Sequence, residues 1–168
     1  MKIDSYRFLD FASRQIMKAW AGREAQARRT IPFTPLPKPL AECTVALVST
    51  AGVARLDDRP FDQEGERRNP WWGDPSWRAI PRGTTEEQVR LYHLHIDPRF
   101  GQADLDVVLP LRRLDELVAE GRVGRSAGTH YSIMGYQLRT EVLEGETAPA
   151  LARDMKSQGV DAAALVPS

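Results

Sequence analysis

Two histidines and an aspartate alternate with apolar residues in one short segment. They are His93, His95 and Asp97, in the run VRLYHLHID that starts at Val89. Histidine transfers protons near neutral pH, and an aspartate can act beside it in proton transfer. We therefore predict His95 and Asp97 as catalytic residues. A histidine pair can also bind a metal ion, but nothing else in the sequence completes a metal site, so none is predicted.

The same segment predicts the element that positions these side chains. Polar and apolar residues alternate from Val89 to Asp97, which is typical of a β-strand. In open parallel α/β sheets, ligands bind beyond the carboxyl ends of the strands. This strand would therefore deliver His95 and Asp97 to that edge of a sheet.

Three other predicted strands end where they could line the same crevice. They cover Cys43 to Thr50, Thr129 to Met134 and Val160 to Val166. Glycine closely follows the first two, and it lets the backbone turn tightly and approach a ligand. The predicted substrate-binding residues end or follow these strands: Thr50, Ala51, Gly52, Ser132, Met134, Gly135 and Ser168.

Helical patterns separate the strands and indicate an α/β fold. One helix starts at Pro110 and stops at Gly121, and another starts near Thr147 and stops at Gly159. Repeated strand and helix units predict a three-layer domain over residues 43–168, with a mainly parallel sheet and helices on both faces, as in Rossmann-like or flavodoxin-like folds. The last strand is apolar enough to be central, which indicates that the natural chain continues beyond Ser168.

Three further segments are predicted around this domain. Residues 1–30 contain a helix, over residues 5–28, with an apolar face. Residues 31–42 form a proline-rich strut. Residues 53–85 form a long insertion rich in tryptophan and proline, and we interpret it as a lid near the carboxyl end of the first strand. A structural insertion or a subunit contact is the alternative interpretation of that insertion.

Composition narrows the class of protein. Lys plus Arg and Asp plus Glu number 23 each, so no net charge attracts the chain to nucleic acid. No run approaches the ~20 apolar residues that span a bilayer, so no membrane partner is predicted. The single cysteine, Cys43, is consistent with a reducing cytoplasm. Both common glycine-rich phosphate-binding motifs are absent.

Several segments, taken in order, resemble the selenoprotein B subunits of glycine, sarcosine, betaine and D-proline reductases and their bacterial relatives. The similarity runs from about Pro35 to Ser168. Its segments are PLPKPLAECTVALVSTAGV, PFD, DPSWRAIP, HLHID, DLDVVLPLRRLDELVAEGRVG, THYSIMGY and GVDAAALVPS. The sequence departs from the family at Asp106, where relatives often have Asn, and at Trp71 and Trp72.

The resemblance implies a catalytic residue that lies just beyond this sequence. In the family, the segment similar to Val160 to Ser168 is followed at once by selenocysteine or cysteine. The implied reaction is reductive cleavage of a small amine-bearing substrate, in which this residue attacks a carbon and a second thiol resolves the intermediate. The implied partners are a subunit whose pyruvoyl group activates the amine as a Schiff base, and a thioredoxin-like reductant. The 168-residue chain is then expected to be inactive as a reductase and prone to form homo-oligomers.

Two other functions stay open at this point. The chain could be a non-catalytic binding or assembly subunit for a small carboxylate or a partner protein. It could also be a racemase-like or lyase-like enzyme that uses His95 and Asp97 for proton transfer. An in-frame TGA codon directly after Ser168 would distinguish the selenoprotein from both.

Overall fold

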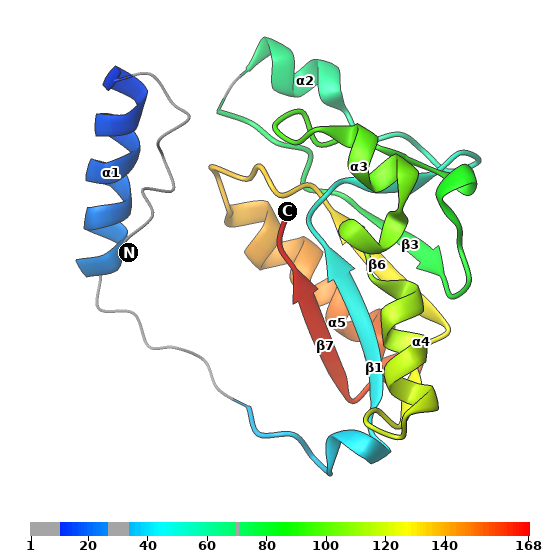
Figure 1. Ribbon diagram of the computed structural model, residues 1–168. Coiled ribbons are helices and arrows are strands. Elements are labelled where there is room, and N and C mark those ends of the chain that lie inside the picture. The colour runs from blue at the N-terminus through cyan, green and yellow to red at the C-terminus, as the bar shows by residue number, and fades with distance from the viewer. Residues whose placement is uncertain (1–10, 27–33, 70) are drawn as a thin grey trace. The chain divides into compact units, whose positions relative to one another are not determined.

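The computed structural model describes residues 11–26, 34–69 and 71–168 (Figure 1). The chain divides into two compact units, Met1–Pro35 and Leu36–Ser168. In the first unit, helix α1 covers Phe11–Gln26 and accounts for most of the helix predicted over residues 5–28. The rest of that prediction, and residues 31–33 of the proline-rich strut, lie outside the described residues.

Strand β1, Thr44–Ser49, is the central strand of the larger unit. All six of its residues are buried, as expected of an apolar strand that is covered on both faces. It pairs in parallel with three strands: β5 (Arg125–Ser126), β6 (Thr129–Ile133) and β7 (Ala162–Val166). The strands predicted over Cys43 to Thr50 and over Val160 to Val166 are therefore neighbours in the sheet.

Strand β3, Trp77–Pro81, makes the sheet mixed. It pairs antiparallel with β6, so the prediction of a mainly parallel sheet is wrong. The strand lies inside the insertion predicted as a lid. Prolines and tryptophans there interrupt the alternation of polar and apolar residues that indicates a strand. The α/β class is confirmed, whereas a Rossmann-like or flavodoxin-like arrangement is not.

A second, two-stranded sheet consists of β2, Val53–Arg55, and β4, Val89–Leu91, which pair antiparallel. The prediction of one strand from Val89 to Asp97 is therefore wrong beyond Leu91, and this strand does not belong to the main sheet. The alternating pattern continues into a turn, where the ring Nδ1 of His93 accepts the backbone N–H of His95 at 3.1 Å.

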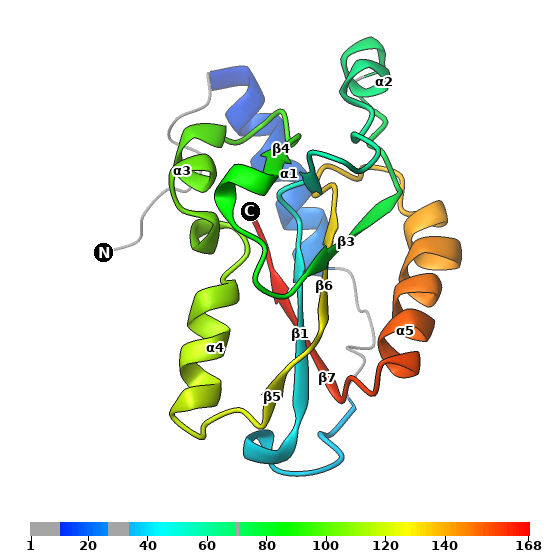
Figure 2. The same cartoon turned by 90° about the vertical axis from the view of Figure 1, so that its right-hand side faces the viewer.

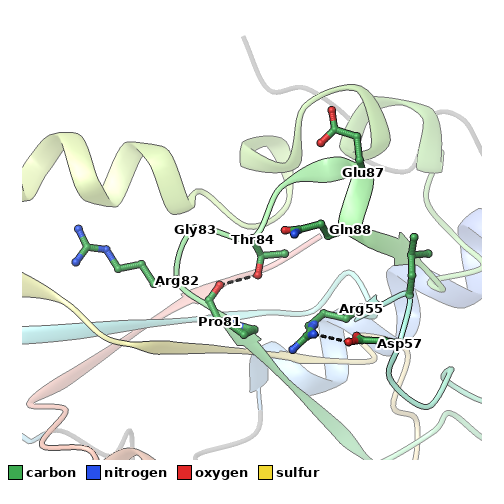
Figure 3. Close-up of a pocket in the computed structure, with 9 residues that line it drawn as sticks. Arg55, Asp57, Pro81, Arg82, Gly83, Thr84, Glu87 and Gln88 are labelled. Atoms are coloured by element: carbon green, nitrogen blue, oxygen red, sulfur yellow. Dashed lines mark hydrogen bonds and ion pairs between the residues drawn. The ribbon is translucent and has the colours of Figure 1, made fainter.

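The insertion between β1 and β4 carries regular elements and borders an open pocket. It contains β2, helix α2 (Gln63–Arg68) and β3. The pocket has a volume of about 460 Å³ (Figure 3). It is lined by Arg55, Leu56, Asp57, Pro81, Arg82, Gly83, Thr84, Glu87 and Gln88.

Helices α4, Leu111–Ala119, and α5, Ala148–Ser157, confirm the two predicted helices. Figure 2 shows them on opposite sides of the main sheet. Gly121 and Gly159, the predicted stops, both adopt a φ of 70°, in the left-handed region that ends a helix without a Cβ clash. Helix α3, Pro98–Ala103, was not predicted. Short helical turns cover Leu40–Glu42, Glu86–Gln88, Leu105–Val107 and Leu143–Thr147.

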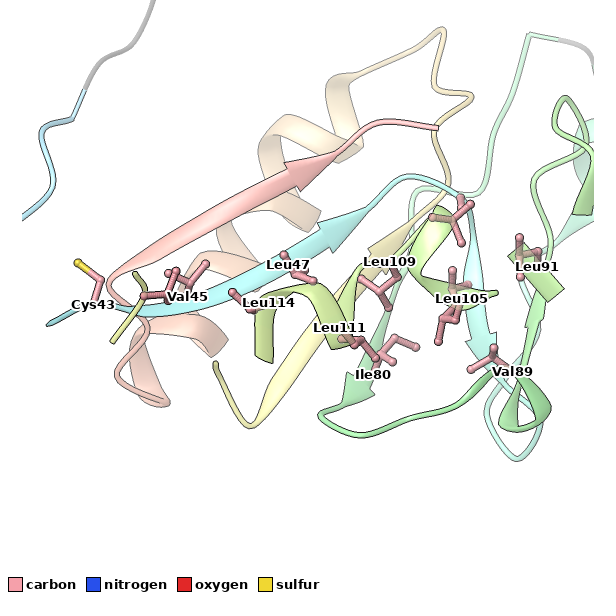
Figure 4. Close-up of a cluster of buried hydrophobic side chains, with 14 residues drawn as sticks. Cys43, Val45, Leu47, Ile80, Val89, Leu91, Leu105, Leu109, Leu111 and Leu114 are labelled. Atoms are coloured by element: carbon pink, nitrogen blue, oxygen red, sulfur yellow. The ribbon is translucent and has the colours of Figure 1, made fainter. Parts of the chain in front are cut away.

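The alternating side chains of β1 build two separate cores. Val45 and Leu47 belong to a cluster that includes Leu111 and Leu114 of α4 (Figure 4). Burying each such leucine contributes about 1.5–3 kcal/mol. On the other face, Ala46 and Val48 share a cluster with Tyr131, Leu151 and Met155. The sheet is thereby fixed against a helix on each face of β1.

Strand β7 confirms the predicted terminal strand but does not lie where it was predicted. Among the described strands it pairs only with β1, and Leu165 is 74% exposed. The prediction of a central strand is therefore wrong for the described part of the chain. An apolar run indicates a strand, but alanine at three of five positions leaves little side chain to require burial.

Candidate functional site

The carboxyl ends of three parallel strands meet at one edge of the sheet. Thr50 follows β1 and donates its backbone N–H to the Val166 carbonyl at 3.1 Å. The Thr50 hydroxyl Oγ1 accepts the backbone N–H of Ser168 at 2.8 Å. Ala51 forms an isolated bridge with Met134. We call the residues predicted to bind substrate the carboxyl-end cluster: Thr50, Ala51, Gly52, Ser132, Met134, Gly135 and Ser168.

Two glycines allow the segments of this cluster to approach one another. Gly52 has a φ of 61°, and a Cβ there would lie 3.0 Å from Met134 Cε. A Cβ on Gly135 would lie 2.9 Å from the Thr50 carbonyl oxygen and 3.1 Å from His93 Nε2. The glycines were predicted to allow close approach of a ligand. In this structure the close approach is between parts of the chain itself.

Ser132 has a structural contact that its position in the sequence did not reveal. Its hydroxyl is fully buried and accepts the backbone N–H of Val53 at 2.7 Å. Ser49 acts similarly, since its Oγ accepts the Ala51 N–H at 3.1 Å and donates to the Val108 carbonyl at 2.7 Å. The two serines fix the backbone that leads from β1 into β2.

His93 lies against the cluster, although only His95 and Asp97 were predicted as catalytic. Its side chain is largely buried, and burial, with a smaller effect of nearby His95, lowers the pKa of His93 below 6.5. Because Nδ1 accepts the His95 N–H, a neutral His93 ring carries its proton on Nε2. That nitrogen faces Gly135 and gives the cluster a neutral N–H donor.

His95 packs beside the His93 ring and has a partner that was not predicted. Its Nε2 is 2.9 Å from Oε1 of Glu66, which belongs to α2. The His95 ring is 5.7 Å from the His93 ring and 4.4 Å from the Tyr136 ring, measured between centroids. Tyr136 directly follows Gly135, so His95 is connected to the cluster on two sides. No local pattern links Glu66 to His95, because they lie 29 positions apart in the sequence.

Asp97 has a different environment from that predicted. Its carboxylate caps α3 by accepting the Arg99 backbone N–H at 3.0 Å, and it binds the Arg99 guanidinium at 2.6 Å. Hydrogen bonds from Arg99 lower the pKa of Asp97. None of its contacts within the described chain reaches the carboxyl-end cluster. Ring contacts connect His95 to the predicted binding residues, whereas the contacts of Asp97 within the described chain are with Arg99.

The 460 Å³ pocket is a separate feature. None of its lining residues was predicted as a site residue. Both of its arginines already have acidic partners, since Arg55 binds Asp57 and Arg82 binds Asp115. We therefore give more weight to the carboxyl-end cluster, where several strand ends and a buried histidine meet.

The described residues lack two features that would define other classes of site. They contain no group of three or more His, Cys, Asp or Glu side chains placed to hold a metal ion. No helix among them is long and apolar enough to cross a bilayer.

Comparison with known proteins identifies the family. Residues 24–168 match the family described as glycine/sarcosine/betaine reductase selenoprotein B. The chain is 31% identical over 133 residues to D-proline reductase subunit gamma of Acetoanaerobium sticklandii, covering 79% of this chain and 52% of that protein. It is 30% identical over 136 residues to the glycine reductase complex component B subunit gamma of Carboxydothermus hydrogenoformans, covering 80% and 30%. No solved structure matches the chain.

A third relative is the betaine reductase complex component B subunit beta of Peptoclostridium acidaminophilum, 28% identical over 154 residues, with 87% of this chain and 34% of that protein covered. The chain thus spans from about a third to about half of the length of these relatives. All three are named as subunits of reductases. The chain belongs to the glycine/sarcosine/betaine reductase selenoprotein B family.

Proposed function

We propose that this chain forms one wall of the substrate site in a multi-subunit reductase that cleaves a small amine-bearing molecule. The observation that carries the proposal is the family match over residues 24–168. The meeting of three parallel strand ends at Thr50, Gly135 and Ser168 supports it, because ligands of α/β proteins bind at such edges.

The proposed reaction begins with a selenolate or thiolate whose residue follows Ser168. It attacks a substrate carbon, so that a carbon–chalcogen bond forms and the C–N bond breaks. The bonding electron pair goes to nitrogen, which takes up a proton. A second thiolate then attacks the chalcogen and forms an Se–S or S–S bond. The carbon–chalcogen bond breaks, and its electron pair stays on the carbon, which takes up a proton. A thioredoxin-like dithiol reduces the new bond.

The described residues would hold the substrate and the backbone near the nucleophile. Thr50 Oγ1 fixes the Ser168 N–H, so it sets the direction in which the chain leaves β7. Nε2–H of neutral His93 would donate a hydrogen bond to the substrate. A pyruvoyl group on a partner subunit would supply an electrophilic carbonyl for the amine. We also propose a cytoplasmic location, because the reactive thiols have to be kept reduced.

Two matched threonine variants test this assignment in the complete reductase complex. Thr50→Val keeps the side-chain shape but removes the acceptor of the Ser168 N–H. Losing a hydrogen bond worth about 1 kcal/mol would lower kcat/KM about fivefold. Thr84→Val is the control, because Thr84 lines the 460 Å³ pocket and bonds the Pro81 carbonyl at 2.7 Å.

We expect Thr50→Val to lower kcat/KM and Thr84→Val to leave it unchanged. The reverse result would place the site in the 460 Å³ pocket. A correctly assembled complex that binds a small carboxylate and reduces nothing would contradict the reductase proposal and favour a binding or assembly subunit.

A further inference from the structure

Glu66 is a buried carboxylic acid with one partnered and one unpartnered oxygen. Its side chain is 3% exposed. Oε1 lies 2.9 Å from His95 Nε2, while Oε2 is buried and has no hydrogen-bond partner among the described residues. The backbone around it is fixed, because Asp62 caps α2 and a Cβ on Gly65 would lie 2.6 Å from the Trp72 ring.

Such a group is suited to holding a proton. Removing a carboxylate from water is costly unless it is paired or neutralised. Burial raises the pKa of Glu66 above 4.5, and the neighbouring His95 limits that rise. Oε2 has no hydrogen-bond donor among the described residues to stabilise a negative charge. Stabilisation of that charge therefore depends on the contact between Oε1 and His95. His95 is therefore the group that compensates the buried carboxyl of Glu66.

His95 is open to solvent. Its side chain is 54% exposed, and Nδ1 has no hydrogen-bond partner in the described part of the chain. One face of its ring packs beside Tyr136, the residue after Gly135. Glu66 therefore holds one nitrogen of the ring, while the ring itself packs beside the residue that follows Gly135. A histidine oriented by a buried carboxylate is a recurrent arrangement for proton transfer.

We propose that Glu66 is the positioning residue for His95, and that the pair donates and accepts the proton needed at the carboxyl-end cluster. Asp97, which was predicted as a catalytic residue from the sequence, instead caps α3 and binds Arg99. The use of the pair in reduction depends on the proposed function. The existence of the pair as a proton-sharing unit does not.

In the reductase, the pair would act when the C–N bond breaks. The electron pair of that bond goes to nitrogen, and the proton on His95 Nδ1 moves to the same nitrogen. Glu66 Oε1 keeps its hydrogen bond to Nε2 and stabilises the imidazolium before the transfer. The ring then takes a proton from solvent, which its exposure permits.

The pair can be tested by NMR on this chain without any partner subunit. The chain has only three histidines, so the ring nitrogens of ¹⁵N-labelled histidine can be assigned by substitution. Glu66→Gln keeps the shape of the side chain but removes its charge. Asp97→Asn is the matched control, because it also neutralises one carboxylate near His95 in sequence. His95→Ala removes the partner of Glu66 at a half-exposed position, where little packing is lost.

Two results are expected. Glu66→Gln shifts the ¹⁵N resonances of the His95 ring, and Asp97→Asn leaves them as in the wild type. The ¹³C carboxyl resonance of Glu66 titrates above pH 4.5 in the wild type, and its midpoint moves further upward in His95→Ala. A merely structural Glu66 would not produce this reciprocal effect.

The proposal is overturned if Glu66→Gln and Asp97→Asn leave the His95 ring resonances equally unchanged. It is also overturned if the Glu66 midpoint stays the same in His95→Ala. Amide spectra show whether each variant is folded, and Glu66→Asp provides a further variant that retains the charge. If the pair behaves as expected but the complete complex reduces no amine, the proposed function fails and the proton-sharing pair stands.

Discussion

Mild acid is predicted to destabilise this fold through one buried histidine, His130. Its side chain is fully buried. Nδ1 accepts the Leu47 backbone N–H at 3.0 Å, and Nε2 lies 3.2 Å from the Ser126 hydroxyl. Leu47 lies between the residues of β1 that pair with β5 and those that pair with β6. The ring thus replaces a strand carbonyl as the acceptor for that N–H, and it must be neutral to do so.

The magnitude follows from the pKa of His130 in the folded chain. Burial lowers this pKa from 6.5 to about 4. As the pH falls, the unfolded chain takes up a proton on this ring first, so the free energy of unfolding declines between pH 6.5 and about 4. The difference of about 2.5 in pKa corresponds to about 3 kcal/mol, at about 1.36 kcal/mol for each pH unit. Above about pH 6.5 the ring adds no pH dependence.

Urea unfolding at a series of pH values measures this effect. His130→Asn is the matched variant, because its amide oxygen can accept the Leu47 N–H but does not titrate. We expect the free energy of unfolding of the wild type to fall by about 3 kcal/mol relative to that of the variant between about pH 7 and pH 4. Parallel pH profiles for the two proteins would refute the reasoning.

Two further predictions concern the carboxyl-end cluster. Ser132→Ala leaves the buried N–H of Val53 without an acceptor and should lower the free energy of unfolding by about 1–3 kcal/mol in urea titrations; an unchanged value would show that water or another group replaces the hydroxyl. Gly52→Ala should lower the free energy of unfolding more than Gly83→Ala in the same assay. Both glycines have a positive φ, but of the two only Gly52 is crowded by neighbouring atoms. Equal losses for the two variants would contradict this reasoning.

The sequence predicts the frame of the main sheet because those signals are local. The apolar runs at β1 and β7, and the proline and glycine that bound α4, are properties of short segments. The run VRLYHLHID misled because a turn can alternate polar and apolar residues as a strand does. Pro98 starts α3 and lies beyond the run, so it does not mark the end of the strand at Leu91.

Part of the candidate site could also be predicted. Thr50, Gly135 and Ser168 are brought together because parallel strands end at one edge, a rule that needs only the strand assignments. The pairing of Glu66 with His95 depends on how the insertion folds back on the chain, and no spacing in the sequence records it. The antiparallel pairing of β3 with β6 is hidden for the same reason.

Under the proposed function, the carboxyl-end cluster surrounds the reactive chalcogen of a reductase. The most direct measurement is thiol reactivity in the complete reading frame, expressed with cysteine at the position after Ser168. Labelling rates with monobromobimane across pH would give the pKa of that thiol, with and without D-proline, glycine or betaine. We predict a pKa below ~8.5 and slower labelling when one of these compounds is bound. A thiol with an ordinary pKa, whose labelling none of them slows, would contradict the account.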